Sequence, residues 1–309
     1  PKVQIGLSFD SFVIERWMRE RDVFVSAAKE LGAEVNVQNA NGDVRDQISQ
    51  IEYFIRKQVD VIVVVAGDCE ALTDVMIKAR EAGIKTVSYD RLIQNAGCDL
   101  YISFDNTEVG RLMARSLLEN IPDGGDIFLI QGPLTDHNVT LVREGIDETL
   151  AGSSLRVVYE SNCAGWVAEN AYTYTKEGLK QDRYVKGIIC GNDDLASQAF
   201  RALSEERLAG KVYVIGQDGD LAACQRIVEG TQEMTAFKSV EQEASMAAKC
   251  AVLLGLGEEI EEARSTAYDG TYQVPYLELQ PIAVTGENMD EVIIKGGFHA
   301  KEDVYLNVN

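Results

Sequence analysis

Short apolar runs alternate with longer stretches of helical periodicity from the first residues of the chain. Helices are predicted between the early runs at about 12–31, 44–57 and 70–82, and glycines end the first and the third of them. The runs are "VQIGLSF" (3–9), "AEVNVQ" (33–38), "VDVIVVVAG" (59–67), "IKTVSYD" (84–90) and "LYISFD" (100–105). Because apolar residues follow one another without alternation in most of them, they predict a parallel sheet covered on both faces.

The same pattern repeats in the second half of the chain. Its strands are predicted at "DIFLIQG" (126–132), "LRVVYE" (155–160), "KGIICG" (186–191), "KVYVIG" (211–216) and "EMTAFK" (233–238). Helices are predicted at about 107–120, 137–150, 166–179, 194–207 and 219–229. The chain is therefore predicted to form two similar doubly wound α/β domains instead of one long sheet.

A tail follows the second repeat. It begins with a helix over 240–255, continues through about 20 residues without a clear pattern, and then has a strand-like segment over 276–284 and a last helix near 287–294. A tail of this length must pack on one of the two domains. Periodicity alone does not indicate which one.

Composition narrows the classes of function. The 309 residues are 46% hydrophobic and suffice for two domains, and no apolar run reaches the roughly 18–20 residues that span a bilayer. The net charge of −21, from 50 acidic and 29 basic residues, disfavours nucleic acid as a partner because it repels phosphate. The chain starts at Pro1 without a signal segment, as a trimmed mature form would.

Motifs for catalysis, cofactors and metals are missing. There is no GxGxxG after the first strand, no GxxxxGK[ST] and no GxSxG. Six cysteines form no CxxC pair and only two histidines occur, so we expect no metal and no cofactor. The sequence leaves open whether a disulfide forms, and Cys69 with Cys98 is the pair that fits best. Cys190 and Cys250 lie in apolar surroundings typical of core residues.

Polar and aromatic residues collect where the predicted strands end, which is where open parallel sheets bind ligands. The candidates are Arg16, Trp17, Asp90, Arg91, Asp136, Asn138, Trp166, Asn192, Asp218 and Lys238. Carboxylates, charged donors, amides and indole rings suit a neutral polyhydroxylated ring, whose hydroxyls both donate and accept. Six of these positions also have a structural interpretation: an ion pair for Asp90 and Arg91, a core residue for Trp17, a helix cap for Asp136 or Asn192, and a turn for Asp218.

Longer stretches resemble the periplasmic sugar-binding proteins of ABC transporters, the pentose and hexose class, and among them those that bind D-xylose. The resemblance runs from end to end. The matching stretches are "ERWMRERDVF" (15–24), "QNANGDVRDQISQIE" (38–52), "YDRLI" (89–93), "YISFDNTEVG" (101–110), "GWVAENA" (165–171), "GQDGDLAACQRI" (216–227), "GTQEMTAFK" (230–238) and "IKGGFH" (294–299).

The resemblance implies a type I periplasmic binding protein fold with two lobes and a three-crossing hinge near 106–108, 238–240 and 282–285. The N-terminal lobe would comprise 1–107 and 240–282, and the C-terminal lobe 108–238 and 285–309. It also implies that the ten candidate residues contact a sugar between lobes that close on it, with the two tryptophans stacking on its faces and with Asp136 and Asn138 in a loop of the second lobe.

The implied function is that of a non-enzymatic, extracytoplasmic receptor, in the periplasm or lipid-anchored at the cell surface. As a monomer, it would deliver D-xylose or a D-glucose-like aldopyranose to an ABC permease. A sensor that presents its closed form to a chemoreceptor or histidine kinase is the alternative, whereas a DNA-binding regulator or a sugar-converting enzyme fits the sequence poorly. His137 and Cys163 depart from the family pattern, so the sequence leaves the exact sugar open.

Overall fold

The apolar run "VIVVV" forms the buried strand β3 (Val61–Val65) in the interior of a seven-stranded sheet, next to the central strand β4. In the computed structural model, which describes residues 1–309, this sheet belongs to unit 1, made of Pro1–Asp105, Thr135–Asn138 and Ser239–Gln280. The strand order is β11-β12-β5-β4-β3-β1-β2. The other bounds are β1 Gln4–Phe9, β2 Glu34–Asn39, β4 Lys85–Tyr89, β5 Leu100–Phe104, β11 Ser265–Tyr268 and β12 Gln273–Leu279.

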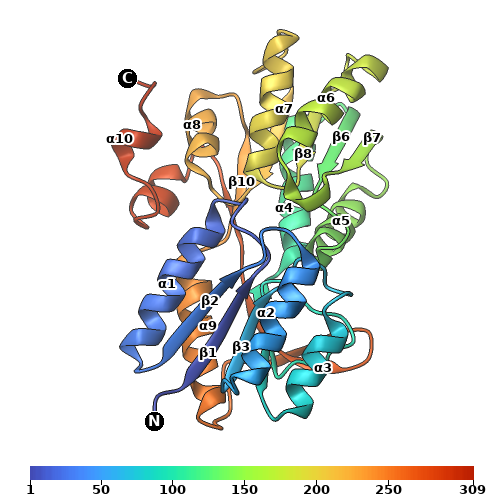
Figure 1. The fold of residues 1–309 in the computed structure, drawn as a ribbon. Helices are drawn as coiled ribbons and strands as arrows, with labels where there is room; N and C mark the ends of the chain where they lie inside the picture. Colours follow the sequence, from blue (N-terminus) through green and yellow to red (C-terminus); the bar gives the residue numbers. More distant parts are fainter. The chain divides into compact units, whose positions relative to one another are not determined.

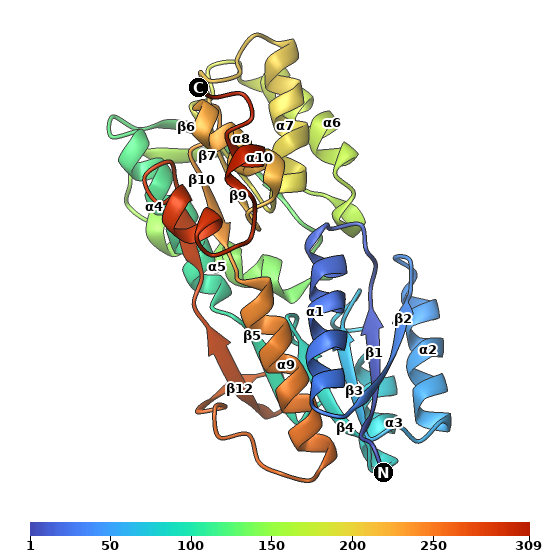
Figure 2. The same cartoon turned by 90° about the vertical axis from the view of Figure 1, so that its left-hand side faces the viewer.

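Helices cover both faces of this sheet, as the unbroken apolar strands predict. Figures 1 and 2 show α1 and α9 side by side on one face, and α2 and α3 on the other. The bounds are α1 Arg16–Glu30, α2 Val44–Arg56, α3 Thr73–Glu81 and α9 Val240–Gly255. On the α2 and α3 face, Ile51, Phe54 and Met76 pack against Ile62 and Val64 of β3, which gives the unit a core of its own.

Unit 2 comprises Asn106–Leu134, Val139–Lys238 and Pro281–Asn309, and its six strands lie in the order β13-β10-β9-β8-β6-β7. Their bounds are β6 Gly125–Gln131, β7 Leu155–Asn162, β8 Gly187–Cys190, β9 Tyr213–Gln217, β10 Met234–Phe237 and β13 Ile282–Val284. The helices are α4 Asn106–Asn120, α5 His137–Leu150 (its first two residues are grouped with unit 1), α6 Glu169–Gln181, α7 Asp193–Glu205, α8 Leu221–Glu229 and α10 Lys301–Val304. In the views of Figures 1 and 2, α4 and α5 cover one face of this sheet and α6 and α7 the other.

The tail differs from its predicted pattern. Segment 276–284 is not one strand: β12 pairs parallel with β5 in the first sheet, and β13 pairs antiparallel with β10 in the second. Pro281, which has no N–H to donate to a ladder, separates the two strands. The helix predicted near 287–294 is a π-helical turn over Asp290–Ile294. A short helix that was not predicted, α10, follows after Gly296 and Gly297.

Two further findings bear on function. All six cysteines are buried and free, so the disulfide that the sequence left open is not formed. Burial raises the pKa of Cys69 to about 12 and that of Cys98 to about 11, which keeps both thiols neutral. Among the helices, none combines the length and the apolar character that crossing a bilayer requires.

Candidate functional site

One aspartate ends a central strand in each unit, and both have a backbone conformation that L-residues avoid. Asp90 follows β4 with a φ of 69°, and Asp218 follows β9 with a φ of 105°. Each donates its N–H to the next strand of its sheet, Asp90 to Ile102 O at 2.7 Å and Asp218 to Ala236 O at 2.9 Å. A non-glycine residue with positive φ costs about 1–3 kcal/mol, and such strain clusters at functional sites.

In unit 1, Arg16 at the start of α1 reaches three carboxyl groups. Its Nη2 atom lies 2.8 Å from Glu20 Oε1, 3.2 Å from Asp90 Oδ1 and 2.6 Å from Glu243 Oε2. Arg16 is 4% exposed and both glutamates are fully buried. Tyr89 Oη also donates to Glu20 Oε2. The guanidinium is therefore fixed in position by α1, β4 and α9 together.

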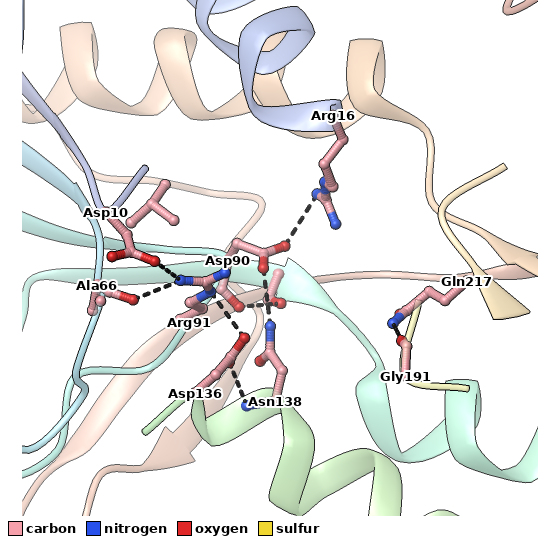
Figure 3. Close-up of polar contacts among 12 residues, drawn as sticks. Asp10, Arg16, Ala66, Asp90, Arg91, Asp136, Asn138, Gly191 and Gln217 are labelled. Atoms are coloured by element: carbon pink, nitrogen blue, oxygen red, sulfur yellow. Dashed lines mark hydrogen bonds and ion pairs between the residues drawn. The ribbon is translucent and has the colours of Figure 1, made fainter. Parts of the chain in front are cut away.

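Arg91 is held in the same way from other elements. Its Nη1 donates to Ala66 O at 2.8 Å and to Asp10 Oδ2 at 3.3 Å, and its Nε lies 3.0 Å from Asp136 Oδ2. Figure 3 shows Arg91 between Asp10 and Asp136. Burial opposes the charge on Arg91, but the charges of Asp136, Asp10 and Asp90 outweigh it and raise the pKa of the guanidinium.

The loop that begins α5 completes this group. Asn138 Nδ2 donates to Asp90 Oδ2 at 2.9 Å, and Asn138 N donates to Asp136 Oδ1 at 3.0 Å. Asp136 thus caps the helix, in agreement with its structural interpretation, and it also forms an ion pair with Arg91. The structure groups Thr135–Asn138 with unit 1 through these contacts, whereas the resemblance assigned this loop to the second lobe. Where the lobes begin and end stays a prediction.

Trp17 lies beneath both guanidinium groups. The Cζ atom of Arg16 is 4.4 Å from the centre of its ring and that of Arg91 is 5.4 Å away. The side chain of Trp17 is 2% exposed, which agrees with the structural interpretation of Trp17 as a core residue. It also supplies a π face that attracts both cations. Its expected stacking on a sugar stays a prediction.

In unit 2 the candidates follow β8, β9 and β10. Asn192 caps α7, where its Oδ1 accepts from Leu195 N at 2.9 Å. Its Nδ2 is buried and has no protein partner, and the same holds for Oε1 of Gln217, whose Nε2 donates to Gly191 O at 2.8 Å (Figure 3). Lys238, at the end of β10, is 4% exposed and forms no ion pair. Buried polar atoms normally have partners, so these atoms suggest a polar ligand.

Trp166 adds an aromatic surface at the same sheet edge. Its ring packs on the backbone after β6 and β8, because a Cβ atom at Gly132 would lie 2.3 Å from the ring and one at Gly191 would lie 3.1 Å away. The backbone φ of Trp166 is 58°, in the left-handed region. Two glycines therefore let a strained tryptophan lie flat on the strand ends.

The turn that carries Asp218 is fixed from behind by Asp193 of α7. Asp193 Oδ2 accepts from Asp220 N at 3.0 Å and from Thr235 Oγ1 at 2.8 Å, and Thr235 Oγ1 also accepts from Gly219 N at 3.0 Å. Burial and the charge of Asp218 raise the pKa of Asp193 to about 7. The turn is thus rigid enough to hold a strained aspartate in place.

The structure brings six of the ten candidates together in unit 1, and places the other four around the strand ends of unit 2. Sequence reasoning missed Glu20 and Glu243 and did not propose Asp10 as a binding residue. Glu20 could have been found, since it lies four residues after Arg16 on one helix face. Nothing in the sequence connects Arg16 to Glu243, 227 residues away. No cluster of side chains suited to a metal ion occurs.

Comparison with known proteins shows the family of this chain. Residues 5–259 match the family described as "Periplasmic binding protein domain". A D-xylose-binding periplasmic protein of Haemophilus influenzae is 43% identical over 308 residues, which cover 98% of this chain and 92% of that protein. The D-xylose-binding periplasmic protein of Escherichia coli is 40% identical over 308 residues and covers 98% and 93%.

A solved structure has the same architecture. It is an ABC transporter solute-binding protein from Clostridium phytofermentans with bound β-D-glucose, and it matches with a TM-score of 0.90 and 25% identity over 97% of this chain and 99% of that one. The fold is therefore that of the type I periplasmic binding proteins, as the resemblance implies. Proteins of this kind are binding components of transporters and not enzymes. This chain belongs to the periplasmic binding protein family.

Proposed function

We propose that this protein binds a neutral aldopyranose, D-xylose or a D-glucose-like sugar, and delivers it to an ABC permease outside the cytoplasm. The observation that carries the proposal is the pair of strained aspartates, Asp90 and Asp218, at corresponding strand ends of the two sheets. Glycine would adopt these conformations without strain, so a carboxylate is retained there at a cost. Each carboxylate can accept charge-assisted hydrogen bonds from sugar hydroxyls, and this would explain why it is kept at a strained position.

The charges favour a neutral ligand. In the unit 1 cluster five carboxyl groups (Asp10, Glu20, Asp90, Asp136 and Glu243) surround two guanidinium groups (Arg16 and Arg91). An anionic sugar would add to this excess of negative charge in a buried setting, where repulsion is strong. Hydroxyl groups can donate to the carboxylates and accept from the guanidinium and amide groups.

The names of the relatives support the same ligand class. Two relatives over nearly the full chain are D-xylose-binding periplasmic proteins, and the matching solved structure contains β-D-glucose. By analogy, the ten candidate residues of both units would bind one sugar molecule, with Trp17 and Trp166 as stacking faces. The protein would act as a monomer, with the sugar favouring its closed form over its open form.

Thermal melting of protein that has been unfolded and refolded to remove carried-over sugar tests the proposal. The panel contains D-xylose, D-glucose, D-galactose, L-arabinose, D-ribose and D-glucuronate. At about one hundred times Kd a bound sugar should raise the Tm by roughly 5–10 °C, since it stabilises the folded state by about 2.7 kcal/mol. We expect this for D-xylose or D-glucose and not for D-glucuronate, in which a carboxylate replaces the C6 hydroxymethyl group of D-glucose.

Asp123→Ala is a control variant that removes one carboxylate outside the proposed site, because Asp123 is exposed in the turn before β6. This variant should respond to sugar like the wild type. No shift with any neutral sugar would overturn the proposal, and an equal shift with D-glucuronate would overturn the neutral-ligand part of it.

A further inference from the structure

Glu20 and Glu243 form a buried pair of carboxyl groups that the sugar-binding proposal does not use. Both side chains are fully buried, one on α1 and one on α9, and both carboxyl groups lie against the same Arg16 Nη2 atom, at 2.8 Å and 2.6 Å. Two carboxylates that meet on one nitrogen in the interior repel each other strongly, and neither can donate a hydrogen bond. A proton on one of the two acids removes this repulsion.

The partners assign the proton to one of the two residues. Glu20 accepts from Arg16 Nη2 on Oε1 and from Tyr89 Oη on Oε2, so both of its oxygens already face donors. Glu243 accepts from Arg16 Nη2 on Oε2, at 2.6 Å, but its buried Oε1 receives no hydrogen bond from any donor. As a carboxylate, Glu243 would leave this oxygen both charged and unsatisfied, which is costly in the interior.

The surrounding charges also favour a proton on Glu243. The groups that face Glu243 are Arg16 and Glu20 of α1, Tyr89 of β4 with Asp90 after it, and Tyr276 of β12. Arg16 is the one cation among them. Burial, followed by the charges of Asp90 and Glu20, raises the pKa of Glu243 well above its usual range. Burial raises that of Glu20 as well, against the lowering effect of Arg16.

We propose that Glu243 carries a proton on Oε1 and donates a hydrogen bond through it to Glu20. This pair of an acid and a carboxylate positions Arg16 and Asp90 for the ligand. Arg16 Nη2 then faces two carboxylates, Glu20 and Asp90, and one neutral acid. If Glu243 loses its proton, the two glutamates repel each other, and the guanidinium that they share moves together with Asp90. Glu243 is thus a positioning residue, and its role in binding rests on the proposed function.

Two isosteric substitutions separate this proposal from a merely structural role. Glu243→Gln keeps an acceptor for Arg16 and places an N–H where the acid proton was. Glu20→Gln removes the negative charge that pairs with Arg16, and its amide N–H₂ replaces an oxygen that accepts from Arg16 or Tyr89. By calorimetric titration with the sugar identified in the melting panel, we expect E243Q to bind within about threefold of the wild type and E20Q to bind about tenfold or more weakly.

The pH profile gives a second readout. The wild type should lose affinity as the pH rises through the folded-state pKa of Glu243, while E243Q should keep it. Stability follows the same sign: because the pKa is raised on folding, the contribution of Glu243 is complete below its ordinary value of 4.5 and is lost as the pH rises through the folded value. The Tm of E243Q relative to the wild type should therefore increase with pH.

Infrared spectroscopy tests the proton without any sugar. A difference spectrum between the wild type and E243Q should contain the carbonyl band of a neutral carboxylic acid at neutral pH. If that band is missing, or if E243Q loses as much affinity as E20Q, the proposal is wrong. If no monosaccharide binds, the proposed function fails, but the infrared band and the pH dependence of the Tm still decide whether Glu243 is protonated.

Discussion

At the scale of single residues, the ends of two strands carry side chains whose backbone is strained, and this connects stability to binding. Asp218 has a φ of 105°, and its turn is held by Thr235 and Asp193. Strain of about 1–3 kcal/mol is retained in the folded protein because surrounding hydrogen bonds fix the turn. The same residue is proposed to bind sugar, so removing its side chain should move the two properties in opposite directions.

Asp218→Gly tests this. Glycine adopts positive φ without strain, so the sugar-free variant should be as stable as the wild type or up to about 1 kcal/mol more stable, after the entropic cost of glycine in the unfolded chain. Its affinity for the sugar should fall by about 2–4 kcal/mol, since buried partners lose a charged acceptor. Urea unfolding and calorimetric titration measure the two effects. A variant that loses both stability and affinity would show that Asp218 is structural.

Only part of this residue-level picture could be predicted from the sequence. Asp90, Arg91 and Asp218 were predicted as site candidates, because each follows a recognisable strand. The contact of Arg16 with Glu243 depends on where α9 packs, and periodicity does not give that. The positive φ of Asp90 was not predicted either, because an aspartate after a strand does not by itself indicate a left-handed conformation.

At the scale of elements, the helices and strands that could be predicted are those whose apolar residues follow a clear periodic pattern. The helices α5 and α9 have the bounds predicted for them, since apolar residues recur along both with helical spacing. The edge strand β11 was missed because its side chains are exposed or half-buried and it has no apolar run. The split of 276–284 between two sheets was missed because both halves look like strands, and only the pairing partners differ.

The crossing of α4 and α5 is an element-scale contact that depends on two glycines. A Cβ atom at Gly110 would lie 2.0 Å from Val142 O, and one at Gly145 would lie 2.0 Å from Thr107 O. Both helices thus approach at backbone distance, and they pack over Ile127 and Leu129 of β6. A methyl group at either position must push the helices apart.

Gly145→Ala should therefore destabilise the protein by about 1–3 kcal/mol or more, even though alanine favours a helix. Gly286→Ala is the matched control: a Cβ atom there has nothing within 4 Å and no positive φ, so the change should stay within about 0.5 kcal/mol. Chemical denaturation measures both variants. Equal stability of the two would contradict the close approach of the helices.

At the scale of the whole molecule, each unit has its own sheet and core, although neither is continuous in sequence. The chain leaves unit 2 after Lys238, folds α9, β11 and β12 in unit 1, and returns at Pro281. If unit 1 unfolds, the pairing of β10 with β13 closes a long disordered loop, whose entropic cost grows only slowly with its length. We therefore expect the sugar-free units to unfold separately, and we expect sugar to connect them if the proposed binding residues of both units hold it.

Phe54→Ala makes this testable. Phe54 is fully buried in the core of unit 1, and its truncation should cost about 3–5 kcal/mol. By scanning calorimetry we expect two transitions without sugar, with unit 1 melting first, and a single transition at saturating sugar. At about one thousand times Kd the sugar stabilises the folded state by about 4.1 kcal/mol, which is similar to the stability that Phe54→Ala removes. In the double variant F54A/D218A sugar should no longer merge the transitions. A single transition of F54A without sugar would instead show that the two units already unfold as one, with no need for a ligand to connect them.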